Sequence, residues 1–158
     1  MRSRNEICVN SLAAPSDVFS FRLNKRVEGH VEKEETWEDE LERDTEKKKT
    51  FVLSLNSAGG KSAITKITPL KHSAPARKTL VMAEIVTGRT HQIRAQAGAH
   101  GHPLAGDLKY GGHSKGGGKG SFFLHAWKLE FLEYSITAPL PEAFRKKAES
   151  LFGFLIPL

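Results

Sequence analysis

Disulfide chemistry has almost no basis in this chain, which has 158 residues and a single cysteine, Cys8. One cysteine excludes an internal disulfide and is typical of a reducing compartment. No apolar run is long enough to span a membrane, and the first residues show no signal-peptide pattern. We therefore expect a cytoplasmic protein with no membrane partner.

Two kinds of ligand site also lack their sequence pattern. The seven histidines show no zinc-ligand spacing, and Cys8 is remote from most of them, so we expect no metal. Gly60-Lys61-Ser62 resembles the end of a phosphate-binding P-loop, but Leu55 stands where that pattern needs its first glycine. A β-branched segment follows instead of a helix. We expect the histidines in capping, core or RNA-contact roles.

Positive charge is what the chain has in excess. Its formal net charge is +6 and its isoelectric point is about 9.5. A basic domain favours polyanions, and nucleic acid first among them, although many basic proteins bind none. The length is typical of one domain with its own core, and we see no internal repeats.

Alternating and β-branched segments predict several strands. We expect strands over 51–56, over 63–70 with an end at Pro69, and over 79–86, which is apolar on both faces and therefore central. The charged run over 31–49 predicts a solvated segment or an exposed helix, with Trp37 and Leu41 as its i,i+4 anchors. Residues 57–60 predict a turn.

The second half of the chain predicts two helices around a further strand. We expect a helix over 90–100, with Thr90 as N-cap and Gly101 just beyond its C-terminus. A flexible basic loop over 112–121 and a strand over 123–131 follow. Pro141 opens a final helix whose buried side chains are Phe144, Ala148 and Leu151 or Phe152. These elements predict an α+β fold, a mixed, mostly antiparallel sheet with flanking helices.

The most polar segment follows the central strand and reads TGRTHQIR over 87–94. Arg89 precedes the first turn of the expected helix and Arg94 lies in it, where positive charge opposes the helix dipole. A nearby phosphate, carboxylate or both would offset this. The alternative is an ordinary capped helix with solvated arginines.

Several motifs in order resemble the RluA-type RNA pseudouridine synthases. The segment over 87–94 and the later GHPLAGDLKYG over 101–111 resemble that family's C-terminal signature. Gly60-Lys61-Ser62-Ala63-Ile64-Thr65 is similar to its Gly-Lys-x-Ala-x-Thr strand. Further matches are Leu124-His125-Ala126, Leu129-Glu130-Phe131 and Ala138-Pro139-Leu140-Pro141 with Phe144. The resemblance covers most of 20–158, and it makes a long helix over 31–49 less expected.

The resemblance implies isomerisation of uridine to pseudouridine within rRNA or tRNA, without a cofactor. The target base must leave its stack to be reached. Arg94 would pair with the family's catalytic aspartate, and Ile93 would pack against the target base or its neighbours. Arg89, His91 and Gln92 would shape the cleft wall or contact RNA. Lys109, Lys115 and Lys119 would contact phosphates.

The family's catalytic aspartate lies in a His-Arg-Leu-Asp motif, which this chain lacks. Asn24, in Phe21-Arg22-Leu23-Asn24, is a poor substitute because an amide is a weak nucleophile. Residues 22–29 match a later family strand better, and there Leu23 occupies the place of an active-site tyrosine. Asp107 is expected in a turn. We therefore expect 1–18 to be a lead-in and 19–158 to be the C-terminal portion of the catalytic domain, truncated at its N-terminal half.

Three functions follow from this departure. The chain is either an enzyme completed by another chain that supplies the aspartate half, a non-catalytic RNA-binding module, or an interaction protein with an exposed sheet edge. The exposed edges and apolar surface predicted for the truncated sheet favour self-association or a partner. We expect the chain alone to be inactive.

Overall fold

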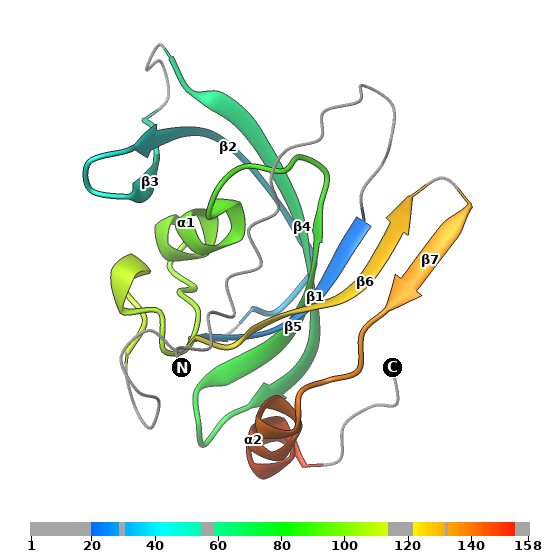
Figure 1. Ribbon diagram of the computed structural model, residues 1–158. Coiled ribbons are helices and arrows are strands. Elements are labelled where there is room, and N and C mark those ends of the chain that lie inside the picture. Colours follow the sequence, from blue (N-terminus) through cyan, green and yellow to red (C-terminus); the bar gives the residue numbers. More distant parts are fainter. Residues whose placement is uncertain (1–19, 29–30, 55–58, 114–121, 132, 154–158) are drawn as a thin grey trace, which may run out of the picture.

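The computed structural model describes residues 20–28, 31–54, 59–113, 122–131 and 133–153. These residues form one curled sheet, two α-helices and a short 3-10 helix (Figure 1). The strands are β1 (Ser20–Glu28), β2 (Glu35–Asp44), β3 (Lys49–Val52), β4 (Lys61–Ser73), β5 (Lys78–Ile85), β6 (Leu124–Phe131) and β7 (Tyr134–Thr137). The helices are α1 (Gln92–Ala99), η1 (Leu108–Tyr110) and α2 (Glu142–Phe152).

The strand order is β3-β2-β4-β5-β1-β6-β7, and every neighbouring pair is antiparallel. The predicted α+β class with a mostly antiparallel sheet is therefore confirmed. The prediction of a central strand over 79–86 is confirmed as well, because β5 has three strands on each side.

The charged run contains the strand β2 and no helix, so the exposed helix, one of the two alternatives for 31–49, was wrong. β2 exposes most of its charged side chains and buries Trp37 and Leu41. Residues four apart share a face in a strand as well as in a helix, so the spacing of these two anchors fits both structures. Pairing with β4 on one edge and β3 on the other decides for the strand.

β4 continues through Pro69 to Ser73, so the predicted end at that proline was wrong. Proline cannot donate to a ladder and is tolerated where a neighbouring strand is absent or where the strand bulges. Both conditions hold here. The pairing of β4 with β2 stops at Ile67, and the register with β5 shifts between Pro69 and Lys71.

The helix after the central strand begins later than predicted. α1 starts at Gln92, and its N-cap is His91, not Thr90. His91 has a positive φ of 54° and makes no side-chain capping hydrogen bond. The predicted C-terminal glycine is confirmed, because Gly101 follows the His100 cap with a φ of 76°.

The C-terminal elements follow the prediction closely. β6 occupies most of the expected strand over 123–131, and α2 begins directly after Pro141. The side chains of Phe144, Ala148 and Phe152 are buried, whereas Leu151 is only partly buried. Most of the predicted loop over 112–121 lies outside the described residues.

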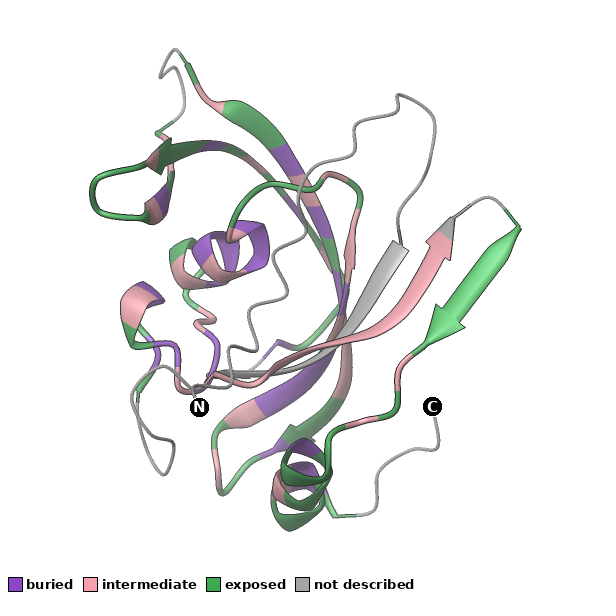
Figure 2. Ribbon diagram, in the orientation of Figure 1, coloured by how far each residue is buried: buried purple, intermediate pink, exposed green. Residues whose placement is uncertain are grey.

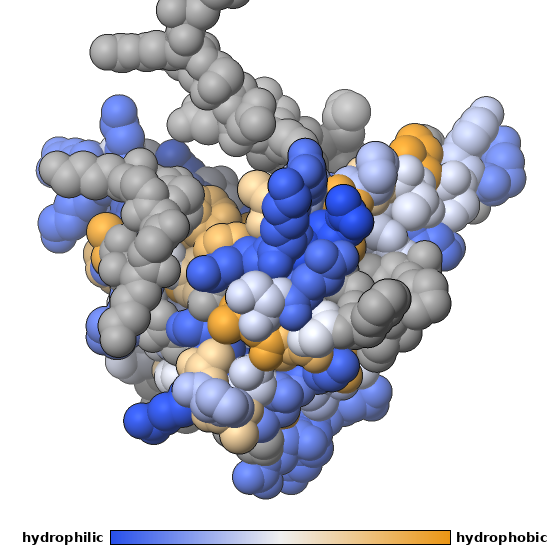
Figure 3. All heavy atoms as spheres, turned by 90° about the horizontal axis from the view of Figure 1, so that it is seen from below, coloured by the Kyte–Doolittle hydropathy of each residue, from blue (hydrophilic) through white to orange (hydrophobic). Residues whose placement is uncertain are grey.

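The two faces of the sheet are covered by different helices. α1 packs in the concave face, where β2, β4 and β5 provide buried side chains (Figure 2). α2 covers one end of the other face, against Leu80 of β5. Seen from below, this side of the molecule is largely hydrophilic, with apolar side chains in separate small groups (Figure 3). Because the segment 87–94 leads into α1, it lies on the face opposite α2.

Candidate functional site

Gln92 fixes the segment TGRTHQIR to the edge of β4. Its Nε2 donates to the Ile64 carbonyl at 3.0 Å and to Thr65 Oγ1 at 2.9 Å. Its Oε1 accepts from Thr87 Oγ1 at 3.0 Å and from the Arg89 backbone N–H at 2.9 Å. The amide has two donors and two acceptor positions, so all four are used within the protein. The structure thus gives Gln92, which is buried, a role in shaping the site and leaves no group for direct contact with RNA.

A second glutamine joins α1 to β2 and β4. Thr65 Oγ1 donates to Gln96 Oε1 at 2.6 Å. Gln96 Nε2 in turn donates to Asp39 Oδ2 at 2.7 Å and lies 3.1 Å from the carbonyls of Trp37 and Ala63. Thr65 and Ala63 belong to the Gly-Lys-x-Ala-x-Thr string, so Gln96 bonds this string to α1.

Arg94 projects from α1 onto Asp107. Its Nε lies 2.7 Å from Oδ2 and its Nη2 lies 2.8 Å from Oδ1, a bidentate pair. The side chain of Asp107 is 1% exposed and that of Arg94 is 14% exposed. The guanidinium also lies over the rings of Tyr110 and Phe122, at 5.0 and 4.2 Å from their centroids. A phosphate, a carboxylate or both were predicted near Arg94 from charge, and the structure places there the carboxylate of Asp107, which was expected only in a turn.

His91 and Tyr110 meet beside this pair. His91 Nδ1 lies 2.9 Å from the Tyr110 hydroxyl, which also accepts the Thr50 backbone N–H at 2.9 Å. Burial, with Arg94 and Lys109 as the nearest positive charges, lowers the pKa of His91 to about 4. His91 is therefore neutral at pH 7. Because the hydroxyl already accepts from Thr50, its own proton is best placed on Nδ1, and Nε2 then carries the imidazole hydrogen.

The other predicted site residues are spread around this centre. Arg89 is exposed, and its Nε donates to the Ser62 carbonyl at 3.0 Å. Ile93 is 7% exposed and belongs to the concave core, so little of it faces solvent. Lys109 Nζ donates to the Lys48 carbonyl. Lys115 and Lys119 lie outside the described residues.

Sequence reasoning missed the residues that connect the site. Tyr110 receives hydrogen bonds or ring contacts from β3, from the N-cap of α1 and from Arg94, yet it was noted only as part of a matching string. Thr50 was not considered, although its Oγ1 donates to the Thr90 carbonyl at 2.9 Å. The sequence offers no signal for the contacts of Thr50, because they join residues 60 and 40 positions apart.

The remaining histidines and acids do not gather around a metal. His100 Nε2 lies 3.0 Å from Asp39 Oδ2, and its ring stacks on Trp37 with a centroid separation of 4.8 Å. Over the described part of the chain, no three histidine, cysteine or acidic side chains lie close enough to hold an ion. None of the described helices has the length and apolarity needed to cross a membrane.

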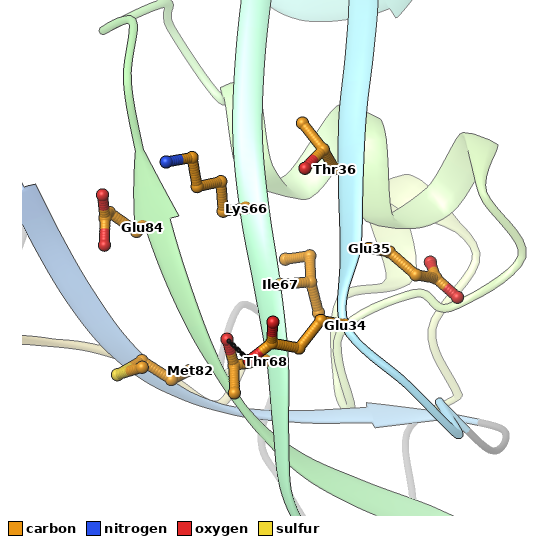
Figure 4. A pocket seen from close by; sticks show the side chains of 8 residues that line it. All are labelled: Glu34, Glu35, Thr36, Lys66, Ile67, Thr68, Met82 and Glu84. Atoms are coloured by element: carbon orange, nitrogen blue, oxygen red, sulfur yellow. Dashed lines mark hydrogen bonds between the residues drawn. The ribbon is translucent and has the colours of Figure 1, made fainter.

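A hollow of about 170 Å³ lies on the opposite face of the sheet (Figure 4). Lys66 lies there, in register with Thr36 of β2 and with Glu84 of β5. Glu34 and Glu35 add two more carboxylates to the lining. The carboxylate of Glu35 turns away to accept from Trp37 Nε1, which leaves the carboxylates of Glu34 and Glu84 on the side of Lys66 (Figure 4). Two carboxylates and one ammonium group make this hollow unsuited to a phosphate backbone, and it is separate from the site at α1.

The antiparallel α+β sheet, with α1 in its concave face and an arginine held there, defines the class of protein. The family model of RNA pseudouridylate synthases matches residues 18–99, about half of the chain. The chain belongs to this family. It is thus an RNA pseudouridine synthase-like protein.

The curated relatives that it resembles are longer proteins. An RNA pseudouridine synthase of Helicobacter pylori is 39% identical over 97 residues, which are 61% of this chain and 38% of that protein. The ribosomal large subunit pseudouridine synthase C of Vibrio vulnificus is 38% identical over 84 residues, which are 46% of this chain and 27% of the relative. The chain therefore spans between about a quarter and two fifths of these two relatives.

A solved structure supports the fold. The human RNA pseudouridylate synthase domain containing 1 superposes with a TM-score of 0.66 at 23% identity, covering 85% of this chain and 59% of that chain. At this identity the likeness shows a shared fold. It places this chain's curled sheet and helices within the fold of a pseudouridylate synthase domain.

Proposed function

We propose that this chain forms the RNA-binding and arginine-bearing part of a pseudouridine synthase active site, acting on uridine in ribosomal or transfer RNA. The Vibrio vulnificus relative is named for the large ribosomal subunit, which favours ribosomal RNA. The chain would supply Arg94 and the basic surface around it. A carboxylate from a partner chain would supply the nucleophile or base.

The observation that supports this role is the state of Arg94. A guanidinium has five N–H donors, and Asp107 takes two of them. Among the described residues no further acceptor contacts Arg94. The remaining donors can orient a second carboxylate.

The surroundings of Arg94 suit a base that has left its stack. Arg89 is exposed at the start of the segment, where it can meet a phosphate. His91 Nε2–H is a neutral donor that can bind an RNA oxygen. No cofactor enters this proposal, because the family resemblance implies none.

The test is tritium release from RNA labelled at uridine C5, with RNA binding measured in parallel. We expect the chain alone to bind RNA and to release no tritium. The Arg89→Gln variant should bind RNA more weakly, whereas Arg77→Gln, an exposed arginine in the turn between β4 and β5, should bind as the unchanged chain does.

Each alternative result has a definite meaning. Tritium release by the chain alone would show that one of its own carboxylates performs the chemistry, and Asp107 and Asp17 would be changed next. Failure of the unchanged chain to bind any RNA would refute the proposed function. Equal binding by Arg89→Gln and Arg77→Gln would remove Arg89 from the RNA contact.

A further inference from the structure

The hairpin formed by β2 and β3 carries a cluster of positive side chains over aromatic rings. Lys49 Nζ lies 5.3 Å from the ring centroid of Phe51 and 5.3 Å from that of Tyr110. Lys47 Nζ lies 5.9 Å from the Phe51 centroid. Phe51 is 38% exposed, so one aromatic ring and the lysines around it face solvent together.

This hairpin is fixed to the candidate site. The Thr50 backbone N–H donates to the Tyr110 hydroxyl, and Thr50 Oγ1 donates to the Thr90 carbonyl. Lys109 of η1 donates to the Lys48 carbonyl in the hairpin turn. Backbone and side chain thus hold β3 against the N-terminal end of α1, so the cations of the hairpin keep a set position relative to Arg94.

Carboxylates compensate only part of this charge. Residues 43–49 contain four cations and two acids, Asp44 and Glu46. Asp44 pairs with Lys47 at 3.3 Å across the turn. Within the described ranges, Arg43, Lys49 and Lys109 form no ion pair with a carboxylate.

The same positive charges act on the neighbouring histidine. Besides burial, the charges of Arg94, Lys109 and Arg43 lower the pKa of His91, and Asp107 only partly opposes them. Arg43 on β2 and Lys109 on η1 therefore act on one point in space, although they come from different elements. An anion placed there would be attracted by both.

We propose that Arg43, Lys49 and Lys109 form a phosphate-binding surface, the hairpin surface, that holds the RNA backbone beside the N-terminal end of α1. The proposal rests on the proposed function. Several cations from separate elements suit the repeating phosphates of a nucleic acid, because each can meet a different phosphate and none reads sequence.

The experiment measures how RNA affinity depends on salt. A fluorescein-labelled oligouridylate is titrated with the full chain by fluorescence anisotropy between about 50 and 200 mM salt. The test variant combines Arg43→Gln, Lys49→Gln and Lys109→Gln. The matched control combines Lys33→Gln, Arg77→Gln and Lys147→Gln, which remove the same formal charge from other parts of the surface.

We expect the slope of log affinity against log salt to become shallower by about 2 in the test variant, since each phosphate contact on a single strand contributes about 0.7. The control should keep the slope of the unchanged chain. Thermal unfolding of both variants checks the fold. If the triple variant does not fold, Lys49→Gln alone should reduce the slope by about 0.7.

Three outcomes would overturn the proposal. Equal slopes in the test and control variants would show that the whole basic surface, and not the hairpin surface, binds RNA. Displacement of the RNA by polyglutamate at the same charge concentration would indicate an acidic protein segment as ligand. Absence of RNA binding by the unchanged chain would remove the ligand altogether. Tritium release separates this proposal from the proposed function. A salt slope that the test variant leaves unchanged would refute the hairpin surface alone. Absence of tritium release when a partner chain supplies the carboxylate would refute the proposed function alone.

Discussion

Replacing Asp107 by asparagine should test the pair that holds the candidate site together. The carboxylate is 1% exposed, and both of its oxygens receive hydrogen bonds from Arg94 at 2.7 and 2.8 Å. An asparagine in the same position has one oxygen and one NH₂ group. The NH₂ would face an N–H of the guanidinium, so one hydrogen bond becomes a contact between two donors.

The expected loss is large because Arg94 would remain buried without its counter-charge. Removing one partner of a buried ion pair typically costs about 3–5 kcal/mol. Arg94 keeps some exposure, 14%, and its contacts with two aromatic rings. We therefore expect a loss of about 3 kcal/mol. For a chain of this length that is a fall in Tm of roughly 6–12 °C.

Urea unfolding followed by circular dichroism measures this difference, with Glu149→Gln as the control. Glu149 pairs with Arg145 at 3.7 Å on α2, and both side chains are about half exposed. The same chemical change there should alter stability by less than about 0.5 kcal/mol. If Asp107→Asn and Glu149→Gln had similar small effects, Arg94 would not depend on Asp107 and the bidentate pair would have no structural role.

Three further changes probe the surroundings of this pair. Gly98→Ala would place a Cβ 2.6 Å from the Tyr110 carbonyl, so it should lower the stability in urea, although alanine normally gains about 1 kcal/mol in a helix; a gain would contradict the close packing of α1 on η1. Gln92→Met removes the acceptor of the Arg89 backbone N–H and of the Thr87 hydroxyl, together with one of the two donors to the Ile64 carbonyl, and should cost about 2–3 kcal/mol; the same urea midpoint as the unchanged chain would contradict this. The folded pKa of His91, about 4, lies below its ordinary value of 6.5, so the unfolded chain takes up a proton first and stability falls as the pH drops from about 6.5 to 4. Solvent screening reduces the expected fall to about 1–2 kcal/mol, and His91→Gln should abolish this part of the pH dependence, measured as urea midpoints at several pH values.

The sequence predicted the elements that have a strong local pattern. The central strand over 79–86 is apolar on both faces, and the final helix has apolar residues at helical spacing, so each pattern fits one structure. The prediction of an exposed helix in the charged run failed because Trp37 and Leu41, four positions apart, fit a strand as well as a helix. Its ladder with β4 pairs Leu41 with Lys61 and Glu35 with Ile67, residues far along the chain, which no local pattern shows.

The candidate site was only partly predictable for the same reason. The positive charge of Arg94 at the positive end of the helix dipole predicted a nearby anion. This argument needs only the local sequence. Which carboxylate it is depends on the turn over 102–107, which brings Asp107 back against α1. Gln92 was predicted at the cleft wall or on RNA. Because Gln92 is buried and makes four internal hydrogen bonds, it fits the cleft wall and not a contact with RNA. This burial cannot be read from a polar motif.

The Arg94–Asp107 pair also explains why the surrounding cations matter. Since Asp107 already neutralises Arg94, a second anion gains less attraction from Arg94 than from a free guanidinium. It also meets a side chain whose orientation was fixed during folding, so little further ordering is needed. Arg94 can then position a carboxylate accurately but contributes little to holding a long polyanion. Under the proposed function, the affinity for RNA would come from charges that no carboxylate compensates. In the described part of the chain the proposed hairpin surface of Arg43, Lys49 and Lys109 is such a set, and Lys49 and Arg94 both lie over the ring of Tyr110. Orientation and affinity are thus assigned to different residues, and the Asp107→Asn and triple-glutamine variants should separate them.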